Sequence, residues 1–281
     1  MDFGASTFIW ASPFSTKTLG LVKKVHDMGF DIIEVCIEDP ALIDSSRIKE
    51  SLTENEIGST ICGAFGPDRD ASSEDKSIRE NAIKYLEACI DVAQAIGAPV
   101  VAGPMYSAVG KTRLLSPSER AEQWNLGVET LKPVADYAGE RGVRLAIEPL
   151  NRFETDFINT AEQGLDLVDR IGASNVGLLL DTFHMNIEEK DIPAAIRLAG
   201  SKVFHFHSCE NDRGTPGKGH VEWKEVVEAL RDINYQGPVV IEAFTTEIKE
   251  IAKAVCLWRP LAPDQDSLAR DGLAFLKKAF A

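Results

Sequence analysis

The sequence predicts a (β/α)₈ barrel (TIM barrel) formed by a single domain of 281 residues. Short apolar runs, often rich in β-branched residues, recur along the chain, and each is followed by a longer amphipathic stretch. Eight such units fill the chain, and barrels of this kind typically occupy about 250 residues. An open doubly wound sheet usually has fewer strands, and Trp10–Pro13 after the first run lacks the GxGxxG pattern of that fold.

The apolar runs are the predicted strands. Because nearly every residue in them is apolar, they fit a parallel sheet that is buried on both faces. In chain order they are Phe3–Trp10, Asp31–Cys36, Ile57–Ala64, Pro99–Ala102, Arg144–Glu148, Val176–Asp181, Val203–His207 and Pro238–Glu242.

The stretches between these runs have helical periodicity. Glycines such as Gly97 and Gly142 follow them and suit a helix C-cap before the next strand. No low-complexity linker divides the chain, and residues 250–281 are expected to add a C-terminal helical extension to the barrel domain. The clearest predicted helices are Ser77–Ile96, Pro117–Arg141, Ala161–Ile171, Trp223–Asp232 and a last one, Ser267–Phe280, that closes the outer ring.

The composition disfavours several classes of protein. The 30 basic and 44 acidic residues give a net charge of −14, whereas nucleic-acid binding requires a basic surface. No apolar run approaches the ~18 residues of a membrane span, and the first residues lack the basic region of a signal peptide. The five cysteines are scattered and fit reduced, mostly buried thiols. We therefore expect a cytoplasmic enzyme with a small-molecule substrate and neither nucleic acid nor membrane as partner.

Four consecutive predicted strands end in a residue that can bind a metal ion. They are Glu148, Asp181, His207 and Glu242, which follow one another at intervals of 33, 26 and 35 residues. Chemistry in these barrels takes place at the carboxyl ends of the strands, so the four side chains should meet at one spot. Three carboxylates there would repel one another unless a cation lay between them. Oxygen-rich ligation with one histidine favours Mn²⁺, Mg²⁺ or Co²⁺.

An acidic residue that ends a strand can instead cap the following helix, which explains any one of the four but not all four together. Near them, His205 is either a hydrogen-bonded residue of the barrel interior or a direct ligand. His184, three residues after Asp181, is predicted to contact the substrate. Arg213 lies in the loop after the seventh strand, where its position alone indicates a solvated side chain.

The second half of the chain resembles the ketose 3-epimerases, the family of D-tagatose, D-allulose (D-psicose) and L-ribulose 3-epimerases. The segment Ile147–Glu154, with the sequence IEPLNRFE, is similar to their fifth-strand signature, and Leu180–Glu189, with the sequence LDTFHMNIEE, to their sixth. His205–His207 with the following loop to His220, and Glu242–Phe244, resemble the ends of the last two strands.

The resemblance implies that Glu148, Asp181, His207 and Glu242 bind one divalent metal ion per subunit, with Mn²⁺ expected and Co²⁺ or Mg²⁺ as alternatives. It implies that Glu148 and Glu242 are also the catalytic acid–base pair. It further implies that Glu154, His184 and Arg213 hold a ketose substrate around O1 and O2. A homodimer or homotetramer is the assembly that the family suggests.

The expected reaction is metal-dependent epimerisation of free ketoses at C3, of the D-fructose/D-allulose, D-tagatose/D-sorbose or L-ribulose/L-xylulose type. Two carboxylates on opposite faces of the carbon would remove and return the proton through a cis-enediolate. The main alternative is an aldose–ketose or hydroxypyruvate-type isomerase on the same barrel. Dehydration of a cyclic polyol and cleavage of abasic DNA are further alternatives, and the net charge argues against the second.

Overall fold

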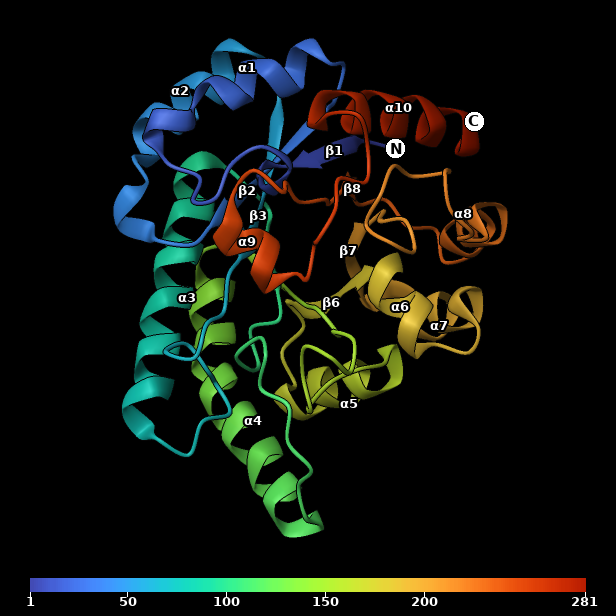
Figure 1. Cartoon of the computed structure of the whole chain (residues 1–281). Coiled ribbons are helices and arrows are strands. Elements are labelled where there is room, and N and C mark those ends of the chain that lie inside the picture. Colours follow the sequence, from blue (N-terminus) through green and yellow to red (C-terminus); the bar gives the residue numbers. More distant parts are fainter.

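A computed structural model describes residues 1–281 and contains a closed barrel of eight parallel strands (Figure 1). Each strand pairs with the next, and the last pairs with the first, so the predicted (β/α)₈ barrel is confirmed. The strands are β1 Phe3–Ser6, β2 Ile32–Ile37, β3 Gly58–Gly63, β4 Val100–Gly103, β5 Arg144–Ile147, β6 Val176–Asp181, β7 Val203–His207 and β8 Val239–Ile241.

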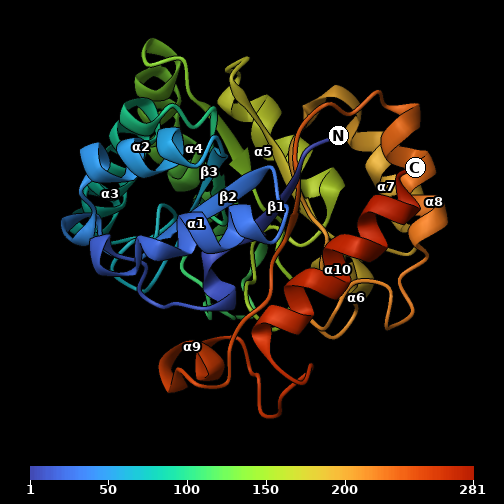
Figure 2. The same cartoon turned by 90° about the horizontal axis from the view of Figure 1, so that it is seen from above.

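Helices surround the barrel, and one short helix, α9, lies apart from the ring at the end of the barrel where the chain leaves β8 (Figure 2). The chain ends lie together, since the rings of Phe3 and Phe280 are 5.6 Å apart. The helices are α1 Gly20–Asp27, α2 Ser45–Glu54, α3 Lys76–Ile96, α4 Pro117–Glu140, α5 Ala161–Ile171, α6 Thr182–Glu188, α7 Ile192–Ala199, α8 Trp223–Asp232, α9 Lys249–Ala254 and α10 Gln265–Ala279.

Local signals in the sequence place the ends of the long helices. Ser116 and Glu119 form a capping box at the start of α4, where Pro117 suits the first turn because its missing N–H would be unpaired there anyway. Helix α3 ends at Gly97, whose φ of +85° is a left-handed conformation that favours glycine. These caps agree with the predicted helix boundaries to within a residue or two.

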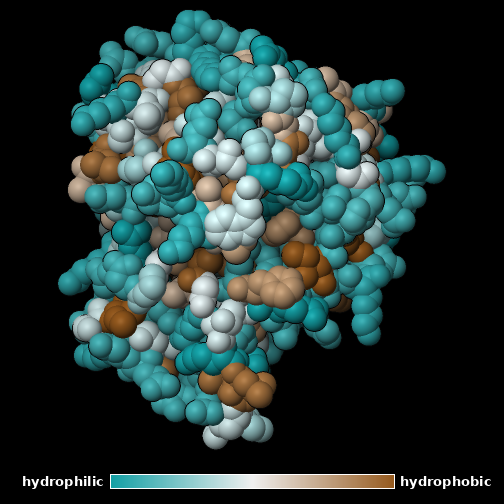
Figure 3. All heavy atoms as spheres, viewed as in Figure 1, coloured by the Kyte–Doolittle hydropathy of each residue, from teal (hydrophilic) through white to brown (hydrophobic).

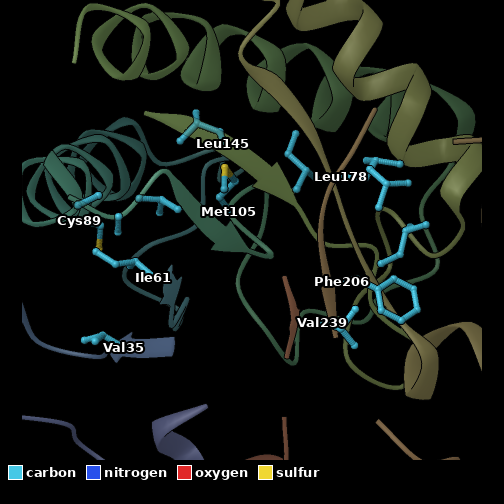
Figure 4. Close-up of a cluster of buried hydrophobic side chains, with 14 of the residues drawn as sticks. Val35, Ile61, Cys89, Met105, Leu145, Leu178, Phe206 and Val239 are labelled. Carbon is cyan, nitrogen blue, oxygen red and sulfur yellow. The ribbon is translucent and has the colours of Figure 1, made fainter. Parts of the chain in front are cut away.

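The core consists of two layers because neighbouring strand residues point to opposite faces. Figure 4 shows the outer layer, in which Val35, Leu178 and Phe206 lie among the side chains between the strands and the helices. The residues that alternate with them point into the barrel. Glu34 therefore faces inward from β2, as His205 and His207 do from β7.

The first strand is shorter than the predicted Phe3–Trp10. It ends at Ser6, and Thr7–Ile9 form a 3₁₀ turn in which the Ser6 hydroxyl accepts the backbone N–H of Phe8 at 3.3 Å. Phe8 and Ile9 are buried in this turn. The apolar character of residues 7–10 therefore reflects the burial of this turn and not a continuation of the strand.

The surface in Figure 3 is largely hydrophilic, with apolar side chains in scattered patches. Phe153 and Trp258 are among the exposed large hydrophobic residues, each with 74% of its surface accessible. None of the helices has both the length and the apolar character that crossing a membrane requires.

All five cysteines are free thiols, and of these only Cys256 is exposed. Burial raises the pKa of the Cys89 thiol to about 12, so it stays protonated and unreactive near neutral pH. We expect a thiol reagent at about pH 8 to modify one cysteine per folded chain quickly and the remaining four only in denaturant. Rapid modification of two or more thiols in the folded protein would contradict this packing.

Candidate active site

Four side chains meet at the carboxyl ends of neighbouring strands. β6 ends at Asp181 and β7 at His207, while Glu148 and Glu242 directly follow β5 and β8. All four are buried, and each offers a ligand atom within 4.8 Å of the others. Because β5 to β8 are consecutive in the barrel, the two glutamates flank the other pair from opposite sides. The strand-end residues singled out in the sequence thus form one cluster.

Asp181 combines the two roles that the sequence left as alternatives. Its Oδ1 accepts the backbone N–H of Phe183 at 2.7 Å and caps α6. Its Oδ2 accepts the thiol of Cys209 at 3.3 Å and faces the cluster. Capping the helix therefore fixes this carboxylate in place without removing it from the site.

The two glutamates are held differently. Glu242 Oε2 accepts an N–H from the Arg213 guanidinium at 2.9 Å, and its other oxygen has no hydrogen bond from the protein. The Glu148 carboxylate accepts none at all, and its nearest cationic or imidazole nitrogen is His184 Nε2 at 3.6 Å. Oxygens of both glutamates thus remain available to a ligand.

The electrostatics of the cluster favour a cation. Burial raises the pKa of Glu148 well above its usual range, and the nearby carboxylates of Glu242 and Asp181 raise it further. Burial also raises the pKa of Glu242. Burial acts to lower the pKa of His207, but the surrounding carboxylates, Glu34 foremost, raise it well above the normal value. Without a metal ion, these residues would have to hold protons to remain together.

The donor set fits a divalent metal ion. His207 Nδ1 has no hydrogen-bond partner, although it is fully buried, and it lies 3.7 Å from Glu242 Oε2 and 3.9 Å from Asp181 Oδ2. A buried ring nitrogen without a partner is costly unless it binds something. One imidazole and three carboxylates match the preferences of Mn²⁺, Mg²⁺ or Co²⁺.

Arg213 is not the solvated side chain that its loop position alone suggested. It is 5% exposed, and its guanidinium lies over the rings of Phe183 at 4.1 Å and Phe244 at 4.8 Å. Its φ of +63° is unfavourable for a residue with a side chain. Its Nη2 lies 3.8 Å from Glu154 Oε1. Carboxylates on several sides raise its pKa although burial acts to lower it, so it remains a cation.

The tautomer of His184 follows from its neighbour Asn151. The backbone N–H of Asn151 donates to His184 Nδ1 at 3.0 Å, so Nδ1 must carry a lone pair. A neutral His184 then holds its proton on Nε2, and burial lowers the pKa of the ring well below its usual value. Nε2 lies 3.2 Å from Arg213 Nη2. The two donor nitrogens thus lie side by side, and the carboxylate oxygen nearest to His184 Nε2 is Glu148 Oε1 at 3.6 Å.

Three residues of the site were not predicted from the sequence. Asn151 links His184 to Glu154, since its Nδ2 donates to Glu154 Oε1 at 2.8 Å. Cys209 donates to Asp181, as described above. Glu34 lies beneath the cluster and contacts both His205 and His207. A charged residue in the middle of the apolar run Asp31–Cys36 was the available signal for Glu34, and Asn151 lies within the segment IEPLNRFE that carries the family resemblance. Cys209 had no comparable signal.

Comparison with known proteins places this arrangement in a family. Residues 22–279 match the family model described as xylose isomerase-like TIM barrel. A probable ketose 3-epimerase of Synechocystis is 37% identical over 281 residues, which covers 100% of this chain and 97% of that protein. The D-psicose 3-epimerase of Agrobacterium fabrum is 35% identical, with 98% of each chain covered. The chain belongs to the ketose 3-epimerase family.

Membership of this family identifies the chain as an isomerase-class enzyme. A crystal structure of D-allulose 3-epimerase from Methylomonas, in complex with D-allulose, has a TM-score of 0.92 to this structure. The two chains are 31% identical, and the match covers 99% of this chain and 97% of the other. The barrel and the order of its elements are therefore those of a ketose 3-epimerase over the whole chain.

Proposed function

We propose that this protein epimerises free ketoses at C3 and depends on a divalent metal ion. The observation that carries the proposal is the pair of buried glutamates, Glu148 and Glu242, on opposite sides of one cluster of metal-ligand type. The names of the related epimerases support the reaction class. Candidate substrates are the pairs D-fructose/D-allulose, D-tagatose/D-sorbose and L-ribulose/L-xylulose.

The metal ligands in this proposal are Glu148, Asp181, His207 and Glu242, and Mn²⁺ is the expected ion. When bound, the cation supplies electrostatic stabilisation of the negative charge that develops on the substrate oxygens. Asp181 is held through both of its oxygens, which suits a residue with a ligand role alone. The two glutamates keep oxygens without protein hydrogen bonds, which suits residues that also exchange protons.

Epimerisation at C3 needs one base on each face of the carbon, because the proton leaves from one face and a proton returns to the other. The C3 proton is weakly acidic, since its removal beside the C2 ketone gives an enediolate. Glu148 and Glu242 approach from β5 and β8, the two ends of the four-strand arc. In one direction Glu148 removes the proton and Glu242 returns one; in the other direction their roles are reversed.

His184 and Arg213 are proposed to bind a substrate oxygen. Their donor nitrogens, Nε2 and Nη2, lie 3.2 Å apart, so one ketose oxygen beside them would accept a hydrogen bond from each. The neutral imidazole donates a hydrogen bond without giving up its proton. Glu154, anchored by Asn151, accepts from a substrate hydroxyl beside them. These contacts would fix O1 and O2 and so align C3 with the two glutamates.

Solvent exchange tests this proposal directly. The Mn²⁺-loaded enzyme is incubated in D₂O with D-fructose, D-tagatose, D-allulose or L-ribulose, and the sugars are followed by NMR. We expect deuterium at C3 together with the 3-epimer, and the relative rates rank the substrates. Deuterium at C1 or C2 with formation of an aldose would identify an aldose–ketose isomerase. No exchange with any of these ketoses would overturn the proposal.

A further inference from the structure

Glu34 spans the interior of the barrel below the metal-ligand cluster. It lies on β2 and reaches His205 and His207 on β7, although β8 and β1 separate these strands around the barrel. The glutamate and both imidazoles are completely buried. Its Oε2 is 2.6 Å from His205 Nε2 and accepts the Thr60 hydroxyl at 3.2 Å. Its Oε1 is 2.9 Å from His207 Nε2.

The two ring nitrogens of His207 therefore face different surroundings. Glu34 Oε1 lies 2.9 Å from Nε2 without forming a hydrogen bond to it, whereas Nδ1 faces the carboxylates of Asp181 and Glu242. A carboxylate next to Nε2 favours the tautomer with its proton on Nε2, because the N–H then lies beside a negative charge and a lone pair there would be repelled by it. The lone pair is then on Nδ1, which is the form that a metal ion requires.

His205 has a different task from His207. Its Nε2 bonds to Glu34, and its Nδ1 is buried without a partner. With the proton on Nε2, the unpaired Nδ1 is only an acceptor. The other tautomer would bury an N–H without a partner and place the Nε2 lone pair 2.6 Å from a lone pair of Glu34 Oε2. His205 thus donates to Glu34 and, with Thr60, compensates the buried carboxylate.

We propose that Glu34, anchored by His205, is a positioning residue that holds His207 with Nδ1 facing the metal-ligand cluster. This inference rests on the proposed metal-dependent function and adds to it the residue that prepares the histidine ligand. Outer carboxylates of this kind change metal affinity by about 10- to 100-fold. Glu34 makes no hydrogen bond to the carboxylates of the cluster, and its direct contact with the cluster is the 2.9 Å approach to His207 Nε2.

The same three residues could instead form a second metal site, since their ligand atoms also lie within 4.8 Å of one another. The direct contact of 2.6 Å between Glu34 Oε2 and His205 Nε2 is the length of a short charge-assisted hydrogen bond. That contact argues for a hydrogen-bonded pair rather than two ligands around an ion. The two interpretations differ in the number of metal ions bound per chain.

The test is a titration of the purified protein with Mn²⁺ alone, followed by the loss of the free-ion EPR signal. The Glu34→Gln variant removes the negative charge beside Nε2 of His207, which favours the proton on that nitrogen in the wild type. Where the new amide NH₂ faces His207, it favours a proton on Nδ1. We expect the wild type to bind one ion per chain and the variant to bind it about 10- to 100-fold more weakly. Glu38→Gln, the same change on a half-buried glutamate that bonds Ser12, is the matched control and should bind like the wild type.

The Mn²⁺ titration distinguishes the positioning role of Glu34 from the proposed function and from a second metal site. Unchanged affinity in Glu34→Gln would overturn the inference and leave the proposed function intact, whereas no Mn²⁺ binding by the wild type would overturn the metal-dependent function itself. Two ions in the wild type and one in the variant would show a second metal site instead. If the variant does not fold, ¹⁵N NMR of histidine-labelled, Mg²⁺-loaded wild type decides: a proton on Nε2 of His207 supports the inference, and a proton on Nδ1 overturns it.

Discussion

Replacing either Glu148 or Glu242 by glutamine is expected to lower epimerisation by about 10²- to 10⁴-fold while the fold is kept. Glutamine has nearly the same shape as glutamate but cannot accept the proton from C3. Because each glutamate is also a proposed metal ligand, the variants are assayed at saturating Mn²⁺. The remaining glutamate serves only one face of the carbon, so neither variant can complete the reaction. Steady-state rates with the ketose that is turned over fastest, together with circular dichroism of the folded state, provide the measurement.

Exchange of the C3 proton with solvent shows which face of the carbon each glutamate serves. With one base left, each variant should still exchange the C3 proton of the epimer whose proton faces that base. In D₂O, Glu148→Gln and Glu242→Gln should therefore label opposite members of an epimer pair without interconverting them. Glu38→Gln serves as the control and should behave like the wild type. Labelling of the same epimer by both variants, or near-normal epimerisation by either, would contradict a two-base mechanism.

The fold was predictable because its pattern is local and repeated. Each apolar run needs two covered faces, and eight runs alternating with helices allow a closed parallel sheet. The same logic predicted the metal-ligand cluster, since residues that end consecutive strands must lie near one another. Asp181 and His207 are paired across β6 and β7 in the structure. A regular fold thus converts spacing along the chain into proximity.

Other parts of the site depend on contacts that spacing does not encode. Glu34 meets His207 only because the barrel closes and brings β2 and β7 to face each other across its interior. Arg213 is buried because the rings of Phe183 and Phe244, from two different strand ends, lie against its guanidinium. The family signature indicated Arg213, but neither contact could be inferred from residue type or position.

Removal of the metal ion is expected to abolish turnover, and Mn²⁺, Co²⁺ or Mg²⁺ should restore it. Exhaustive treatment with a chelator, followed by a check of residual metal and an assay before and after each ion is added back, measures this. If the three ions restore different activities, the comparison shows which ion the enzyme prefers. Full activity of a protein stripped of metal would refute the role assigned to the cluster.

The stripped protein should also lose stability as the pH rises. The folded protein holds the pKa of Glu148 above its ordinary value of 4.5 and that of His207 above 6.5. Above those ordinary values the unfolded chain binds fewer protons than the folded one, so the free energy of unfolding falls with pH. A bound divalent cation takes the place of these protons and adds about 2.7 kcal/mol at 100 times its Kd. Melting temperatures of stripped protein should therefore fall above about pH 6.5, because at lower pH the lowered pKa values of buried His184 and His205 act in the opposite direction. Those of metal-loaded protein should fall much less. An equal fall in both forms would mean that the buried carboxylates are not neutralised by the ion.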